Sequence, residues 1–255
     1  MPDRAHAPVA LQMYTLRDLT KDDFVGTLRS VARIGYGGIE LAGFPDMPAS
    51  ELAKLLGDLG VRAAGAHVAL PVLQNQLEGT LDYCATIGCS DVACPFLPAE
   101  LRQSEDDWRR VADTLNGIGR RCKERDVQLS YHNHAFELDR FDGKTGLEIL
   151  FDAADPGLVQ WEADVYWVEY AGVNAADLLR TYKGRAQLIH IKDMTRDDRR
   201  TFAEVGEGRI DFGPIFAAGD AGGARWYIVE QDRCERPPLE SVELSLEHLR
   251  AWGRA

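Results

Sequence analysis

The chain has 255 residues, of which 45% are hydrophobic and 27% are charged, so it can bury a large apolar core. Its 41 acidic and 29 basic side chains give a net charge of −12, which argues against binding to nucleic acid or to anionic membrane. No apolar run approaches the roughly 20 residues that span a bilayer. Residues 1–8 lack the apolar block of a secretory signal, so we expect none.

The cysteines also indicate the compartment. Their number is odd, and the first three are spaced by five residues, unlike the CxxC pairs of a zinc site. We expect buried reduced thiols and a cytoplasmic protein. The five are Cys84, Cys89, Cys94, Cys122 and Cys234.

Short β-branched or apolar runs alternate with longer amphipathic segments along the whole chain. Residues 24–32 and 108–118 show the apolar spacing of helices. Eight strand–helix units in about 250 residues predict one (β/α)₈ TIM barrel over residues 1–255. No GxGxxG opens a helix after the first strand, which argues against an open doubly wound sheet. The predicted strands are residues 9–16, 38–42, 62–69, 91–96, 127–134, 159–167, 186–194 and 226–232.

Polar residues gather at the ends of the last four predicted strands, where a barrel of this type places its catalytic groups. Side chains alternate across a strand, so His132 and His134 share one face, as do His190 and Lys192. Four neighbouring strands therefore deliver imidazoles and carboxylates to one mouth. The polar strand ends are residues 130–134, followed by Glu137, and residues 162–167, 190–193 and 230–232.

Such a cluster costs several kcal/mol in repulsion and desolvation unless a cation compensates. Carboxylates with an imidazole suit one divalent ion: Mn²⁺, Mg²⁺, Co²⁺ or Zn²⁺. The alternative is that each strand-end His is only hydrogen-bonded and each strand-end Asp caps the next helix. Both interpretations stay open at this point.

Six motifs in order extend from the first strand to the last helix: LQMYTLRD (11–18), IGYGGIEL (34–41), YHNH (131–134), HIKD (190–193), EVGEG (204–208) and VEQD (229–232). Together they resemble the sugar phosphate isomerase/epimerase-like family of the xylose isomerase-like barrel superfamily. Its members include inosose dehydratase and the ketose 3-epimerases.

The resemblance implies one divalent metal held by Glu, Asp, His and Glu from the fifth to the eighth strand. Asp164, His190 and Glu230 match this set directly. Many relatives carry Glu where this chain has His132, and the nearest carboxylate is Glu137. We therefore expect Glu137 as the fourth ligand, with His132 as the alternative.

The resemblance also implies proton transfer next to a carbonyl that the metal polarises. The acid, base and polarising groups would be Glu230, His134, Glu137 and Lys192. The residues expected to bind substrate are His67, His132, Trp167 and Arg196.

Glu204 and Glu207 in the loop before the last strand would repel a phosphate, so we expect an unphosphorylated keto sugar or polyol. The first expectation is an isomerase or epimerase; the alternative is a lyase or dehydratase acting on an inosose or 3-keto-glycoside. A DNA-cutting AP-endonuclease-like barrel is disfavoured by the charge and the six histidines. A non-catalytic sugar-binding or partner subunit stays open, as does a homo-oligomer.

Overall fold

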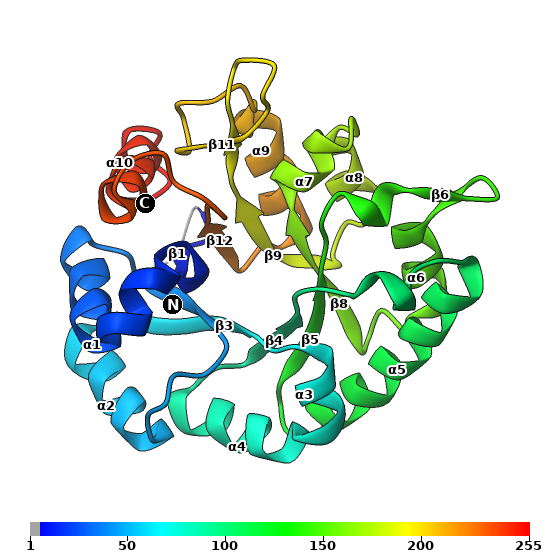
Figure 1. The fold of residues 1–255 in the computed structure, drawn as a ribbon, viewed down its shortest axis with the longest axis horizontal. Helices are drawn as coiled ribbons and strands as arrows, with labels where there is room; N and C mark the ends of the chain where they lie inside the picture. Colours follow the sequence, from blue (N-terminus) through cyan, green and yellow to red (C-terminus); the bar gives the residue numbers. More distant parts are fainter. Residues whose placement is uncertain (1–5) are drawn as a thin grey trace.

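The computed structural model describes residues 6–255, and eight parallel strands close into a barrel in its centre (Figure 1). Residues 1–5, which hold part of the segment assessed for a secretory signal, lie outside the described residues. The strand order around the barrel is β1-β12-β9-β8-β5-β4-β3-β2. The predicted (β/α)₈ barrel is confirmed. Its strands are β1 (Val9–Gln12), β2 (Gly38–Ala42), β3 (Arg62–His67), β4 (Asp91–Cys94), β5 (Gln128–His132), β8 (Val159–Asp164), β9 (Ala186–Ile191) and β12 (Trp226–Val229).

Helices form a ring around the barrel, and the first and last of them, α1 and α10, lie side by side (Figure 1). They are α1 (Arg17–Ile34), α2 (Ala49–Leu59), α3 (Leu70–Asn75), α4 (Leu77–Ile87), α5 (Glu105–Lys123), α6 (Gly146–Ala153), α7 (Val165–Tyr170), α8 (Ala175–Thr181), α9 (Phe212–Gly222) and α10 (Pro238–Ala251). Short 3₁₀ turns are η1 (Met13–Leu16), η2 (Ala99–Leu101) and η3 (Phe136–Leu138), and two hairpins are β6 (Arg140–Phe141) with β7 (Lys144–Thr145) and β10 (Asp193–Met194) with β11 (Phe202–Ala203). Among the described residues, no helix combines the length and apolar character needed to cross a bilayer.

Local sequence explains these elements well, and α5 is an example. The Ser104 side chain accepts the N–H of Asp107 and caps the helix, whose first turn is acidic and whose last turn is basic, as the helix dipole favours. Trp108, Val111 and Leu115 recur at helical spacing and are buried. The apolar face therefore packs inward while the charged face meets solvent.

The barrel interior is apolar at one end and polar at the other. Ala10, Leu188 and Ile228 form part of a small buried apolar cluster in the lower barrel. Two residues further along the same strands stand Gln12, His190 and, just beyond β12, Glu230, all buried. Since alternate residues share a strand face, the interior face of these three strands changes from apolar side chains to polar side chains towards the carboxyl end.

A glycine on β3 makes room for one of these polar groups. A Cβ placed on Gly65 would lie 2.5 Å from Oε1 of Glu40 on β2, closer than real Cβ contacts come. The β2–β3 pairing also shifts register between Ile39 and Glu40. The interior of the barrel is thus shaped around the Glu40 carboxylate.

Several predicted strands end earlier than expected. The fifth stops at His132 rather than residue 134, and the last stops at Val229 rather than residue 232. The sixth stops at Asp164, because the Asp164 side chain accepts the N–H of Trp167 and begins α7. The candidate site residues therefore lie at strand ends and in the first turns beyond them.

Candidate metal centre and active site

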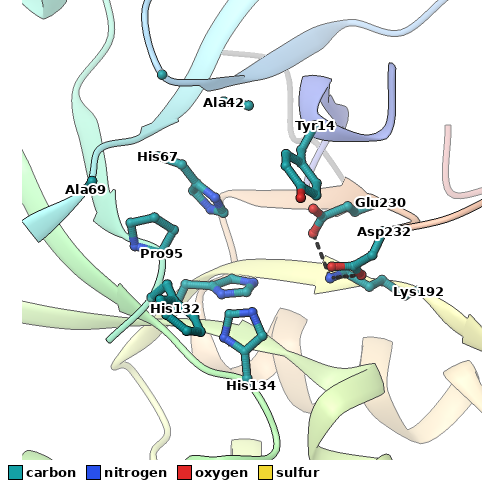
Figure 2. Close-up of a pocket in the computed structure, with 12 residues that line it drawn as sticks. Tyr14, Ala42, His67, Ala69, Pro95, His132, His134, Lys192, Glu230 and Asp232 are labelled. Carbon is teal, nitrogen blue, oxygen red and sulfur yellow. Dashed lines mark hydrogen bonds and ion pairs between the residues drawn. The ribbon is translucent and has the colours of Figure 1, made fainter. Parts of the chain in front are cut away.

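A cavity of about 410 Å³ opens at the carboxyl ends of the barrel strands. Figure 2 shows three imidazoles on one side of it and a carboxylate-rich wall with one lysine on the other. The imidazole wall is His67, His132 and His134; the opposite wall is Glu230, Asp232 and Lys192. Its remaining lining residues are Tyr14, Ala42, Gly43, Ala69, Pro95 and Phe96.

Four buried side chains bring one ligand atom each within 4.8 Å of the others: His132, Asp164, His190 and Glu230, here called the upper cluster. Nδ1 of His190 lies 2.8 Å from Glu230 Oε2, and Nε2 of His132 lies 3.3 Å from Asp164 Oδ2. Neither ring nitrogen of His132 makes a hydrogen bond, although both are buried. Two imidazoles and two carboxylates, with donor atoms left unsatisfied, fit a divalent cation.

Asp164 serves two purposes in this geometry. Its Oδ1 caps α7 through the N–H of Trp167 at 3.1 Å, while Oδ2 points into the upper cluster. The two interpretations of a strand-end aspartate, helix cap and metal ligand, are therefore compatible in one residue.

Lys192 balances the charge of the upper cluster. Its Nζ lies 2.9 Å from Asp164 Oδ2, 2.8 Å from Glu230 Oε2 and 2.9 Å from Asp232 Oδ2. Burial alone would raise the pKa of the Glu230 carboxyl, but Lys192 and His190 outweigh it and hold that pKa well below its usual range. The three carboxylates in turn hold the pKa of Lys192 well above its usual range, against the effect of burial. The site therefore contains ionised carboxylates and a protonated lysine at neutral pH.

A second group of polar side chains includes Glu162, two residues before Asp164 on β8, and His67, which lines the cavity. His67, Glu162, His132 and His190 also bring ligand atoms within 4.8 Å of one another, here called the lower cluster. Nε2 of His67 lies 2.6 Å from Glu162 Oε2. Burial and the neighbouring Glu40 raise the pKa of Glu162 to about 7, although His67 and His190 oppose this. The lower cluster shares His132 and His190 with the upper one.

Glu40 and Gln12 were absent from the expected site, yet they hold one of its ligands. Nε2 of His190 lies 2.7 Å from Glu40 Oε2, which also accepts a 2.7 Å hydrogen bond from Gln12 Nε2. Because Nε2 faces Glu40, Nδ1 is the nitrogen left to face Glu230. A carboxylate behind an imidazole in this way fixes which nitrogen binds a metal. The available sequence signal was a charged or amide residue inside an otherwise apolar strand, in VALQ and GIELA.

Glu137, the expected fifth-strand ligand, lies outside both clusters. Its Oε1 accepts the Tyr131 hydroxyl at 2.6 Å and its Oε2 accepts the backbone N–H of His134 at 2.7 Å. Burial raises the pKa of Glu137 to about 8, so it is a poor anionic ligand. Both Glu137 oxygens therefore accept hydrogen bonds from residues of the same strand and the turn after it, Tyr131 and His134. The geometry favours His132, the alternative ligand, over Glu137. It also removes Glu137 from the acid–base groups facing the cavity.

The expected acid–base and substrate-contact residues divide into two groups. His67, His132 and His134 line the cavity, and burial, helped by His132 and Lys192, lowers the pKa of His134 to about 3, so its ring is neutral. The Trp167 ring lies beside Lys192, with its centroid 5.8 Å from Lys192 Nζ. Arg196 does not reach the cavity: it is exposed, and its Nε donates to the Glu207 carbonyl at 3.4 Å.

The loop between β9 and α9 is fixed by Asp193, next to Lys192. The buried Asp193 carboxylate accepts the backbone N–H groups of Met194, Gly206, Gly208 and Ile210 at 2.7–3.0 Å. This arrangement leaves no room for a side chain at position 208, where a Cβ would overlap the Asp193 carboxylate.

The two acidic residues of that loop do not face the cavity. Glu204 accepts the Ser241 hydroxyl at 2.7 Å, and Glu207 lies 2.9 Å from Nε2 of His248 on α10. Glu204 and Glu207 are therefore not placed to repel a phosphate in the cavity, contrary to the expectation from the sequence. Any such repulsion has to come from Glu230 and Asp232, which do line the cavity.

Comparisons with known proteins agree with this architecture. Residues 28–252 match the xylose isomerase-like TIM barrel family. An inosose dehydratase of Clostridium perfringens is 28% identical over 92% of each chain. A sugar phosphate isomerase/epimerase from Parabacteroides distasonis has a TM-score of 0.85 at 25% identity, over 98% of this chain and 96% of that one. The zinc-containing IOLI protein has a TM-score of 0.76 at 16% identity, over 95% and 97%. With its barrel, its strand-end site and a family match over most of its length, the chain belongs to the xylose isomerase-like TIM barrel family.

Proposed function

We propose that the protein is a divalent-metal-dependent enzyme that moves a proton next to the carbonyl of an unphosphorylated polyhydroxy ketone. The observation that carries this proposal is the upper cluster at the floor of a cavity with two chemically different walls. His132, Asp164, His190 and Glu230 would hold the cation. When bound, it would polarise a substrate carbonyl and so acidify the neighbouring C–H.

The chain's own residues supply the proton transfers. Glu230 is ionised and His134 is neutral, so both can accept a proton, and they stand on opposite walls (Figure 2). Lys192 is protonated and its Nζ lies between Asp164, Glu230 and Asp232; once a cation held Asp164 and Glu230, Lys192 would be free to donate a hydrogen bond to a substrate oxygen that gains negative charge. Positioned groups of this kind contribute about 10²–10⁴-fold each to rate.

The two walls fit epimerisation or isomerisation first. If His134 removes a proton at one wall, the protonated Lys192 on the other wall would deliver one to the opposite face and invert the carbon, while return of the proton from His134 to the neighbouring carbon would isomerise the sugar. Dehydration is the second candidate, and the similarity to inosose dehydratases over 92% of the chain favours it. In that reaction His134 would remove the proton next to the carbonyl, and the protonated Lys192 on the opposite wall would give a proton to the departing hydroxyl, which leaves as water.

An unphosphorylated substrate follows from the charges that face the cavity. Glu230 and Asp232 line it, and its one lysine is already shared among three carboxylates. A phosphate dianion would lie against the Glu230 and Asp232 carboxylates, with no unshared cationic side chain among the lining residues to pair with it. A small keto sugar or inosose with hydroxyl groups would instead find hydrogen-bond partners on both walls.

The test is turnover in D₂O of a panel of inososes and ketohexoses. The protein is first stripped with a chelator and then loaded with Zn²⁺, Mn²⁺, Co²⁺ or Mg²⁺ in turn. Deuterium uptake without loss of water indicates epimerisation or isomerisation, and loss of water indicates dehydration. Asp164→Asn and His190→Ala should lose both bound metal and turnover, while Arg196→Ala should keep both. Full turnover after stripping, or full metal occupancy in both site variants, would contradict the proposal.

A further inference from the structure

A second cavity adjoins the first at the mouth of the barrel. It has a volume of about 560 Å³ and lies between the beginning of α1 and the segment that joins β2 to α2. It shares Tyr14, Ala42 and Gly43 with the first cavity. A molecule bound over the upper cluster could therefore extend into it.

Small residues stand at the junction of the two cavities. Ala42 ends β2, and Gly43 follows with a φ of +78°, a backbone conformation that favours glycine. A Cβ at Gly43 would meet no atom within 4 Å, so the space beside it is open. No side chain at position 43 therefore separates the two cavities, and a single molecule could extend from one to the other beside Gly43.

Tyr14 forms a wall common to both cavities. Its side chain is 42% exposed, and the Arg17 guanidinium lies 4.3 Å from its ring centroid. Arg17 also donates a 3.0 Å hydrogen bond to the Tyr14 carbonyl. The ring is therefore exposed to ligand but supported from behind.

The second cavity combines an apolar wall with a polar rim. Phe44 stacks on Tyr83 with ring centroids 4.3 Å apart, and the Tyr83 hydroxyl donates to the Met47 carbonyl at 2.9 Å, which fixes this wall. The other apolar lining residues are Met13, Phe24 and Leu41, and the polar rim is Arg17, Thr20, Lys21 and Asp46. Such a surface suits a ring with a flat apolar face and a hydroxylated edge.

We infer that the adjoining cavity binds a second ring, attached through a glycosidic oxygen to the ring that lies over the upper cluster. The ligand class is then a two-ring glycoside rather than a single sugar. A sugar ring and a phenolic ring share the required chemistry, a flat face with polar edges. This inference rests on the proposed function for the position of the first ring.

The experiment compares three probes on the Zn²⁺-loaded 255-residue chain: D-glucose, cellobiose and 4-nitrophenyl β-D-glucopyranoside. Dissociation constants come from calorimetric titration, and saturation-transfer NMR shows which ring receives magnetisation. We expect at least one two-ring probe to bind tenfold or more tightly than glucose, with contacts on both rings. The better of the two identifies the second ring as a sugar or an aryl group.

Two variants locate the effect. Lys21→Trp fills the adjoining cavity from its exposed rim, and Phe44→Ala removes its wall. Both should abolish the advantage of the two-ring probe and leave glucose affinity unchanged. Lys183→Trp, an exposed lysine beyond α8, is the matched control and should change neither. The Lys21 variant remains informative even if Phe44→Ala unfolds, since Lys21 is exposed.

Equal affinity for all three probes, or an advantage that survives Lys21→Trp, would overturn the second-ring subsite. Turnover of single-ring inososes or ketoses alongside equal affinities would overturn only the subsite and leave the proposed function in place. Absence of metal-dependent turnover across the whole panel would instead remove the proposed function.

Discussion

Replacement of Glu40 by glutamine would test how the barrel interior prepares His190 for a cation. Glu40 Oε2 accepts from both His190 Nε2 and Gln12 Nε2, and all three side chains are completely buried. A glutamine has the same shape, and one amide oxygen can still accept both hydrogen bonds. The substitution therefore removes mainly the negative charge behind the imidazole.

The expected effect is weaker metal binding with an intact fold. Loss of a carboxylate behind a metal-binding histidine costs about 10–100-fold in affinity. That range corresponds to about 1.4–2.7 kcal/mol of binding free energy. Competition between the protein and a chromogenic chelator for Zn²⁺ measures it directly, and the thermal unfolding of the metal-free protein verifies the fold.

Glu162→Gln is the matched control, because Glu162 is another fully buried carboxylate in the same layer. Its Oε2 lies 3.7 Å from His190 Nε2, against 2.7 Å for Glu40, and its near partner is His67 instead. Glu40→Gln should therefore weaken Zn²⁺ binding more than Glu162→Gln. Equal losses would show that only the total charge of the interior matters, and unchanged affinity in Glu40→Gln would refute the orienting role.

Three further outcomes are expected. His134→Ala should lower kcat by roughly 10²–10⁴-fold while the metal content by elemental analysis stays at the wild-type level; loss of metal would make His134 a ligand. Burial raises the pKa of Glu137 from 4.5 to about 8, so the native state holds a proton that the unfolded chain releases. As the pH rises from 4.5 to 8, the free energy of unfolding of the wild type should therefore fall relative to that of Glu137→Gln, which urea titrations at each pH measure. Parallel pH profiles of the two proteins would contradict this. The kcat/KM of a phosphorylated substrate should exceed that of its free counterpart by less than about 100-fold, or about 2.7 kcal/mol. A larger preference for the phosphorylated form would overturn the charge argument.

The alternation of strands and helices was enough to predict the barrel, because each unit carries its own local signal. Strand ends were less predictable. Asp164 ends its strand by capping α7 through Trp167 N–H, and that competition between cap and strand depends on the three-dimensional turn. The carboxyl end of each strand was nonetheless in the right place to predict Asp164, His190 and Glu230 as neighbours.

The remaining site residues depend on contacts that no local pattern contains. Gln12 and Glu40 lie directly opposite each other on β1 and β2, and they reach His190 only because the barrel closes through β12 and β9. Glu137 lies outside the upper cluster for a related reason: counting positions made it the nearest carboxylate to the fifth strand. The turn at η3 directs its oxygens back to Tyr131 and the backbone of His134.

Asp193 has a consequence for how this scaffold could be diversified. Its carboxylate fixes the loop backbone at positions 194, 206, 208 and 210, while the intervening tip at 195–201 carries no residue of the candidate site. The tip is therefore an insertion point between two anchored ends. Loops of different length or sequence could be grafted there to alter what approaches the mouth, and Lys192 would keep its position because the neighbouring aspartate anchors the strand end independently of the graft.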